Sequence, residues 1–399
     1  MKWIKSNLSE LIEEFERGIS YSSEDLQDGG VPMMNLACID KSGYYRDGEL
    51  KYYTGKYTEG DKVFPGDMLI ACTDLTRNAD IVGTPIFVPE GEEFYVFTMD
   101  LVKLVPKPGI DKSYLYYALK TNAYRSYIKP WASGTNVLHL DLKGVYDYQL
   151  YYPEDIEEQR RIAKVLSDLD SKIALNEKIC GNLESIAQKI YDYWFVQFDF
   201  PDGSGLPFKS SGGEMTFDSI LKRRIPSGWE VVRVGDILSK VPASYKLKTD
   251  EYRGEGKYPV IDQATGTYIA GFTDRKDALL SAFPAVVFGD HSCAVKYVNF
   301  AFCRGADGTQ ILVPCHKSIY TEYLYFAVKN IRFRKGYARH FSLLKDSYII
   351  APDEKLAKAF DIQVKPIFER RRIIIEENIF LTRLRNTLIP LLVGNHLEC

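Results

Sequence analysis

The chain has few of the residues from which metal sites and disulfide frameworks are built. Its 399 residues include seven cysteines and five histidines. No CxxC pair occurs, and the histidines do not share ligand spacing. The cysteines are scattered along the chain, at 38, 72, 180, 293, 303, 315 and 399. We therefore expect no metal ligands, and thiols that remain reduced in the cytoplasm.

Motifs of nucleotide and hydrolase chemistry are also absent. The sequence contains no GxGxxG, GxxxxGK[ST], HExxH or GxSxG, and it lacks the NPPY or DPPY tetrapeptide of amino-methyltransferases. Asp290 and His291, in GDHSC, are a candidate acid–base pair. Adjacent residues in a strand point to opposite faces, so the two do not easily converge. His291 is left as a loop residue that contacts a ligand or as an ordinary turn residue, and we expect no catalytic residue.

Long apolar runs and net positive charge are lacking too. No stretch approaches the ~18 apolar residues of a membrane span, and the N-terminal MKWIKSNLSELIEEF has no apolar signal-peptide core. The net charge of −3 argues against a wholly basic nucleic-acid binder but leaves local basic patches open. The 28 tyrosines mildly favour a binding protein. We expect a soluble cytoplasmic protein without membrane contact.

An internal repeat organises what is present. SYLYYALK (113–120) recurs as EYLYFAVK (322–329), and HLDLKGVYDYQLYYP (139–153) is echoed by HFSLLKDSYIIAP (340–352). Each half is predicted to be rich in strands, with the YLYxAxK segments as helices. The expected strands are 67–73, 84–89 and 94–105 in the first half and 284–290, 294–303 and 308–314 in the second.

A long helix is predicted after each half. Segment 157–195 has no proline and one glycine, and its apolar residues alternate in steps of four and three, which is a heptad seam. The seam comprises Ile162, Leu166, Leu169, Ile173, Asn176, Cys180, Leu183, Ala187, Ile190 and Trp194. Adding 201 to most of these positions gives a second seam at Ile367, Arg370, Ile374, Glu377, Leu381, Leu384, Leu388 and Leu391.

The two seams favour a helix pair. Each alone also fits an amphipathic helix that faces a core, but two matched seams indicate that the helices pack together, and antiparallel pairing is open to them. The polar interruptions Asn176 and Glu377 fall at matching positions, where a buried polar residue fixes register. Pro366 predicts a kink or a late start in the second helix.

Basic and aromatic residues follow each YLYxAxK helix, at 120–143 and 329–345. Lysine and arginine in such stretches suit a phosphate backbone, and the small polar ASGTN loop (132–136) can approach one closely. The alternatives are a solvated basic face and an ordinary turn. The candidate DNA-contacting residues are Arg77, Arg125, Lys129, Ser133, Gly134, Thr135, Asn136, His139, His291, Arg332, Arg334, Lys335, Arg339 and His340.

The chain resembles the specificity subunits of type I restriction–modification systems. EEQRRIAKVLSDLDSKIALNEKICGNLESIAQKIYDYWF (157–195) follows the central conserved region of that family, and NIFLTRLRNTLIPLLVGN (378–395) is similar to its second conserved region. SGTNVLHLDLKGV fits the family's loop of glycine and serine or threonine before a Leu-Lys strand. The resemblance runs from Trp3 to Asn395.

The resemblance implies an α+β fold with two similar β-rich target-recognition domains separated by a long antiparallel two-helix coiled coil. The expected domains are target-recognition domains at 1–152 and 225–352, spacer helices at 153–198 and 353–395, and a linker at 199–224. The linker is also indicated by its glycine, serine and proline content.

The resemblance further implies a non-catalytic subunit that reads a bipartite site in double-stranded DNA. Its partners would be two copies of a modification methyltransferase subunit and a restriction motor-nuclease subunit. S-adenosylmethionine is expected on the methyltransferase, and no cofactor on this chain. Two other readings stay open: a non-catalytic two-domain protein-interaction scaffold, and an enzyme with an unrecognised site.

Overall fold

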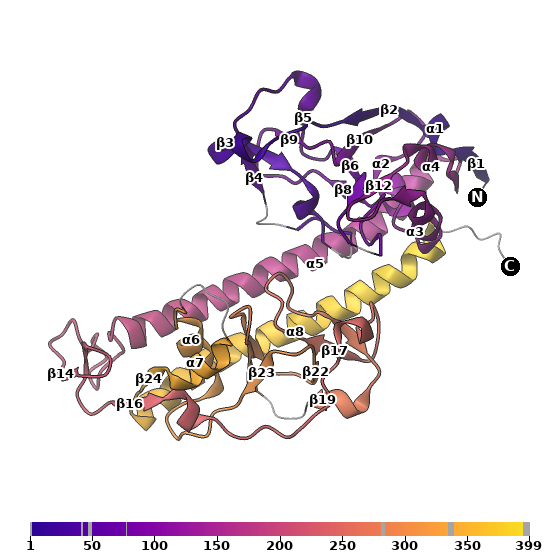
Figure 1. The fold of residues 1–399 in the computed structure, drawn as a ribbon. Coiled ribbons are helices and arrows are strands. Elements are labelled where there is room, and N and C mark those ends of the chain that lie inside the picture. Colours follow the sequence, from indigo (N-terminus) through magenta and orange to yellow (C-terminus); the bar gives the residue numbers. More distant parts are fainter. Residues whose placement is uncertain are drawn as a thin grey trace. The chain divides into compact units, whose positions relative to one another are not determined.

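The computed structural model describes residues 2–40, 43–46, 50–76, 78–280, 284–333 and 339–393. These residues form a mixed α+β fold that divides into two compact units (Figure 1). Unit 1 comprises Met1–Ile173 with Leu381–Cys399, and unit 2 comprises Ala174–Phe380. No helix in the described part of the chain is long and apolar enough to cross a membrane.

In the described part of the chain, unit 1 contains two four-stranded sheets, a three-stranded sheet and a two-stranded ribbon. In the ribbon, β1 (Trp3–Asn7) pairs antiparallel with β13 (Gln149–Pro153), which joins the ends of the first half. One sheet has the order β2-β10-β6-β8, with bounds Ile12–Arg17, Leu101–Pro106, Met68–Ala71 and Pro85–Phe87. The other has the order β4-β3-β9-β5, with bounds Lys51–Tyr53, Leu26–Met34, Tyr95–Phe97 and Lys62–Val63.

Short helices cover the unit 1 core. Tyr114, Leu115 and Tyr117 of α2 (Lys112–Ala118) are buried against apolar residues of β6 and β10. The side chain of Asp111 caps α2 by accepting a hydrogen bond from the backbone N of Tyr114, as expected at a helix N-terminus. The helices are α1 (Leu8–Leu11), α2 (Lys112–Ala118), α3 (Asn122–Ile128) and α4 (Leu142–Asp147).

Unit 2 repeats this plan. Its ribbon pairs β16 (Glu230–Arg233) with β24 (Tyr348–Ala351), and α6 (Thr321–Lys329) and α7 (His340–Asp346) take the places of α2 and α4 in the chain. A three-stranded sheet has the order β21-β20-β23, with bounds Val295–Val298, Ala285–Gly289 and Thr309–Leu312. A four-stranded sheet has the order β18-β17-β22-β19, with bounds Gly271–Thr273, Tyr258–Ile261, Phe302–Arg304 and Leu279–Leu280.

The predicted internal repeat is confirmed by pairing patterns and single backbone bonds. β3 and β9 are parallel and each is flanked by an antiparallel neighbour, and β17 and β22 have the same arrangement. The backbone N of Leu8 donates to the carbonyl of Tyr148 at 2.9 Å, and Val234 donates to Ser347 at the same distance. The two halves therefore share one fold.

Two long helices are present. α5 runs over Ile156–Tyr191 and continues as a short π-helical turn, Asp192–Val196, while α8 runs over Glu354–Leu392. In unit 1, Ile162 and Leu166 of α5 lie in one buried cluster with Ile389 of α8. In unit 2, Asn176 of α5 contacts Glu377 of α8, while Glu184, further along α5, contacts Arg371, which comes earlier on α8. The two segments there are therefore antiparallel.

The structure corrects the second seam. Arg370 and Leu391, which the heptad pattern predicts to face the partner helix, are exposed. Arg371 is largely covered instead, and Arg385 is 7% exposed. An α-helix has 3.6 residues per turn, so a strict seven-residue pattern drifts around it. A late start at Pro366 is also wrong, because α8 begins at Glu354.

Other local expectations are corrected as well. The expected strand 94–105 is two strands, β9 and β10, in different sheets, and 294–303 likewise divides into β21 and β22. The Leu-Lys segment after the ASGTN loop is helix α4 rather than a strand. The segment 199–224 contains β14 (Met215–Asp218) and the start of β15 (Arg223–Pro226), which form a hairpin.

Candidate nucleic-acid interface

The ASGTN segment of unit 1 is the tip of a β-hairpin. β11 (Ala132–Ser133) pairs with β12 (Leu138–Leu140), which pairs in turn with β7 (Thr73–Asp74). Gly134 has φ +145°, and a Cβ there would lie 1.9 Å from the carbonyl oxygen of Val137, so only glycine fits this turn. The structure brings five candidate residues together on this hairpin, and all are exposed: Ser133, Gly134, Thr135, Asn136 and His139.

A buried carboxylate holds the neighbouring loop. Asp74, which is fully buried, accepts hydrogen bonds from the backbone N of Ile81 at 2.7 Å and of Val82 at 3.0 Å. Arg125 donates to the backbone carbonyls of Val82, Ala79 and Asp80. Burial lowers the pKa of Arg125 from its usual value. The guanidinium is thus engaged in building the loop, and we withdraw Arg125 from the DNA-contacting set.

Two candidates of unit 1 remain, Lys129 and Arg77. Lys129 is exposed at the C-terminal end of α3. Trp131, two residues further on, packs so closely on Gly144 of α4 that a Cβ there would lie 2.4 Å from the indole ring. This contact fixes the base of the hairpin. Arg77 lies outside the described residues.

The described candidate surface of unit 2 includes a turn after β20. Asp290 is 7% exposed, and its Oδ1 accepts from the backbone N of Phe341 at 2.8 Å. Its carbonyl oxygen accepts from the backbone N of His340 and lies 3.0 Å from His340 Nδ1. His340 is itself 6% exposed. It therefore ties α7 to the turn, and we withdraw it from the DNA-contacting set.

A glutamine presents the turn at the surface. Gln263 accepts from the backbone N of His291 at 3.1 Å and donates from Nε2 to the carbonyl of Asp307 at 3.0 Å. The backbone carbonyl of Gln263 accepts a hydrogen bond from the hydroxyl of Ser292 at 2.6 Å. His291 and Ser292 are exposed. Asp290 is buried while His291 is exposed.

In the basic stretch of unit 2, some residues are exposed and one forms an ion pair within the unit. Arg332 and Arg339 are exposed, whereas Arg334 and Lys335 lie outside the described residues. Lys329, at the start of the stretch, forms an ion pair with Glu184 of α5 at 2.5 Å. Lys329 therefore packs α6 against α5.

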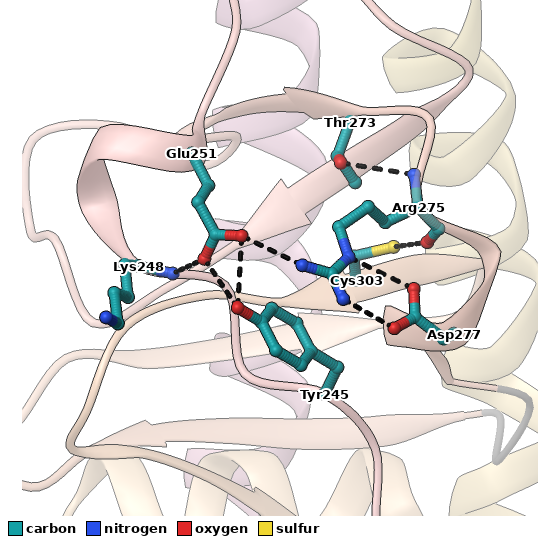
Figure 2. A network of polar contacts seen from close by, with 7 residues as sticks. All are labelled: Tyr245, Lys248, Glu251, Thr273, Arg275, Asp277 and Cys303. Atoms are coloured by element: carbon teal, nitrogen blue, oxygen red, sulfur yellow. Dashed lines mark hydrogen bonds and ion pairs between the residues drawn. The ribbon is translucent and has the colours of Figure 1, made fainter.

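A polar network that the sequence did not reveal rigidifies another loop of unit 2 (Figure 2). Arg275 forms two hydrogen bonds with Asp277, at 3.1 and 2.7 Å, and one with Glu251 at 3.0 Å. Its guanidinium also lies 3.6 Å from the centre of the Tyr245 ring. Because its donors already face carboxylates, Arg275 holds these residues together and is not free to bind phosphate. Among the described residues, no group of histidine, cysteine or acidic side chains could hold a metal ion.

The first half of the chain matches a family model of known proteins. Residues 1–185 match the family model of the type I restriction modification DNA specificity domain. The chain is 28% identical over 318 residues to the type I restriction enzyme MjaIX specificity subunit of Methanocaldococcus jannaschii, covering 74% of this chain and 71% of that protein. It is 33% identical over 121 residues to the HindI specificity subunit of Haemophilus influenzae, covering 29% and 26% of the two chains.

A solved structure has a similar fold along the whole chain. The crystal structure of a type I restriction-modification system S subunit from M. genitalium superposes with a TM-score of 0.54, and the match covers 99% of this chain and 96% of that one. The two sequences are 16% identical, so the likeness concerns the fold.

Proposed function

Residues 1–185 match the family model of the type I restriction modification DNA specificity domain, and from this premise we propose that the chain is the DNA sequence-recognition subunit of a type I restriction–modification complex. Each unit reads one half of a bipartite site in double-stranded DNA. The chain itself is not catalytic and holds no cofactor. A methyltransferase subunit supplies S-adenosylmethionine and modifies the site that this chain selects.

The observation that carries this proposal is the repetition of one fold, with exposed polar residues beside the segment that follows β6 in unit 1 and β20 in unit 2. In unit 1 the chain leaves β6 and enters the sheet that presents the hairpin of residues 133–136. In unit 2 it leaves β20 and enters the turn with His291 and Ser292. Two such surfaces on one chain, each beside a repeated strand, suit a target with two half-sites.

The chemistry of these surfaces suits a duplex. Hydroxyl, amide and backbone N–H groups at the unit 1 hairpin donate to phosphate oxygens or to base edges. In unit 2, Arg332 and Arg339 add positive charge, and the planar fork of an arginine reads guanine in the major groove. Arg77, Arg334 and Lys335, outside the described residues, stay in the proposed set, together with Lys129, Ser133, Gly134, Thr135, Asn136, His139 and His291.

The long helices complete the proposal. We infer that α5 and α8 form an antiparallel coiled coil that spaces the two reading domains; at about 1.5 Å per residue, α5 is roughly 54 Å long. Ile362, Ile373 and Phe380 of α8 are 63%, 48% and 64% exposed. Such apolar surface suits docking of two methyltransferase copies and the motor-nuclease subunit. The cytoplasm, where these subunits meet DNA, is the proposed location.

The test measures DNA binding and methylation together. The chain with its methyltransferase partner should bind duplex DNA with strong salt dependence and prefer one bipartite site. Sequencing of methylated adenines in host DNA should give two half-sites with a fixed gap, and one heptad inserted in both helices should lengthen that gap. Binding that is absent or salt-insensitive with the partner present would favour a protein-interaction scaffold, and methyl transfer by the chain alone would favour an enzyme.

A further inference from the structure

Two ion pairs join α5 to α8, one inside each unit. In unit 1, Asp170 of α5 accepts a hydrogen bond from Nη1 of Arg385 of α8 at 2.6 Å. In unit 2, Glu184 of α5 lies 3.2 Å from Nη2 of Arg371 of α8. The acid belongs to α5 and the arginine to α8 in both pairs.

The unit 1 pair is shielded from water by tyrosines. Arg385 is 7% exposed, and its guanidinium lies 4.2 Å from the centre of the Tyr44 ring. The hydroxyl of Tyr117 donates to the second oxygen of Asp170 at 2.7 Å. With water largely excluded, the interaction between the two charges is stronger than at an open surface. Removal or reversal of one charge is correspondingly costly.

The unit 2 pair has a similar environment. The hydroxyl of Tyr325 donates to Glu184, Lys329 lies 2.5 Å from it, and Arg371 lies 4.9 Å from the centre of the Tyr268 ring. Burial raises the pKa of Glu184, but the neighbouring Arg371 and the hydrogen bonds from Lys329 and Tyr325 outweigh burial, and the pKa lies below its usual value. The carboxyl is thus held in its charged form.

The spacing of the four charges gives the arrangement a consequence beyond stability. Asp170 and Glu184 are two heptads apart on α5, and Arg371 and Arg385 are two heptads apart on α8. If two α5 helices from separate copies paired antiparallel in this register, Asp170 of each would meet Glu184 of the other. Two α8 helices would likewise set Arg371 against Arg385. Like charges in such contacts repel strongly.

We propose that Asp170, Glu184, Arg371 and Arg385 form a charge code that pairs α5 with α8 and rejects the pairing of two α5 or two α8 helices from different copies of the chain. Pairing of α5 from one copy with α8 from a second copy, an exchange of helices between chains, satisfies the same code. Closure within one chain is favoured over that exchange because the two helices are tethered at high effective concentration. The inference is independent of what the chain binds.

The test exchanges charges in the full-length chain. Asp170→Arg with Arg385→Asp keeps opposite charges within the chain but makes each helix complementary to itself. Glu184→Arg with Arg371→Glu does the same through the other pair. Each double variant, refolded at high protein concentration and low salt, should show a dimer association constant at least about tenfold above that of the wild type. Light scattering after size exclusion measures it, and added salt should reduce the difference.

The matched control carries all four exchanges. It places arginines on α5 and acids on α8, so pairing within the chain remains complementary and pairing of like helices is again repulsive. It should be as monomeric as the wild type. Double variants that fold and stay monomeric, or a fourfold variant that dimerises like them, would overturn the proposal.

A comparison of melting temperatures tests the proposal even where a variant folds poorly. Asp170→Arg alone places two arginines together in unit 1, and the added Arg385→Asp should recover most of the melting temperature that the single change loses. If the double variant were no more stable than the single one, the charges would not be interchangeable. The code would then be rejected, whatever the oligomeric state.

Discussion

Asn176 of α5 donates a hydrogen bond from Nδ2 to Oε2 of Glu377 of α8, with 2.8 Å between the two atoms. The same nitrogen lies 2.8 Å from Oδ1 of Asn378. Asn176 is 1% exposed, and the contact lies inside unit 2. The two polar residues that interrupt the apolar seams in the sequence are partners in the structure, which supports a role in fixing the register of the helices.

Replacement of Asn176 tests that contact. Asn176→Leu leaves two half-buried acceptors short of a donor beside a buried position, and we expect a loss of about 1–3 kcal/mol in the free energy of unfolding. Urea denaturation followed by circular dichroism measures it. Leu175→Ala is the control, since Leu175 is 53% exposed and its change should stay within about 0.5 kcal/mol. An Asn176→Leu variant as stable as the wild type would show that the contact has no structural role.

The sequence predicts well those features that depend on pattern and repetition. The long helix after each half follows from heptad spacing, and in the first half also from the absence of proline and the single glycine, whereas α8 continues through Pro366, where the sequence predicts a kink or a late start. The repeat follows from matched segments, and its strand pairing recurs in both units. The resemblance to type I specificity subunits is confirmed by the comparisons.

The direction of individual side chains is not in the pattern. Arg125 and His340 lie in basic stretches, yet one holds backbone carbonyls and the other is buried beside Asp290. Asp74 and Gln263 shape the exposed loops but have no local signature, because their partners are brought near only by folding. Tertiary contacts thus decide which polar residues build a surface and which remain free to bind.

Two glycine substitutions should change stability in opposite directions. Gly134→Ala forces a side chain into φ +145° and against the Val137 carbonyl, so we expect a loss of about 1–3 kcal/mol and weaker DNA binding by the complex with its methyltransferase. Gly181→Ala in α5 meets no atom within 4 Å and should stabilise the chain by about 1 kcal/mol. Thermal unfolding distinguishes the two. A stable Gly134→Ala variant with full DNA affinity would remove the hairpin from the interface.

Removal of one exposed charge should test the proposed second half-site. Arg339→Ala should weaken duplex binding at every sequence or relax one position of the second half-site, according to whether the guanidinium meets phosphate or a base. A phosphate contact should also lower the slope of log affinity against log salt by about one. Lys178→Ala, an equal charge change on the exposed face of α5, is the control. Equal affinities for both variants and the wild type would exclude Arg339.

Unit 2 contains a buried acid whose titration should make stability depend on pH. Glu322 is 3% exposed, and burial raises its pKa to about 7, although the hydrogen bond from the hydroxyl of Tyr297 acts in the opposite direction. Asp361 of α8 contributes to the rise. The folded chain therefore keeps a proton that the unfolded chain releases near its ordinary pKa of about 4.3. Between those two values the folded state binds more protons, and stability falls as pH rises.

Glu322→Gln should remove this dependence, because the amide is neutral at every pH. The wild type should lose up to about 1.4 kcal/mol per pH unit between roughly pH 4.5 and 7 relative to the variant, and above pH 7 the difference should level off. Urea denaturation of both proteins from pH 4.5 to 8 measures the difference. Glu354→Gln, at an exposed position of α8, controls for the loss of one negative charge. Parallel stability curves for the wild type and Glu322→Gln would mean that Glu322 is already ionised in the folded chain.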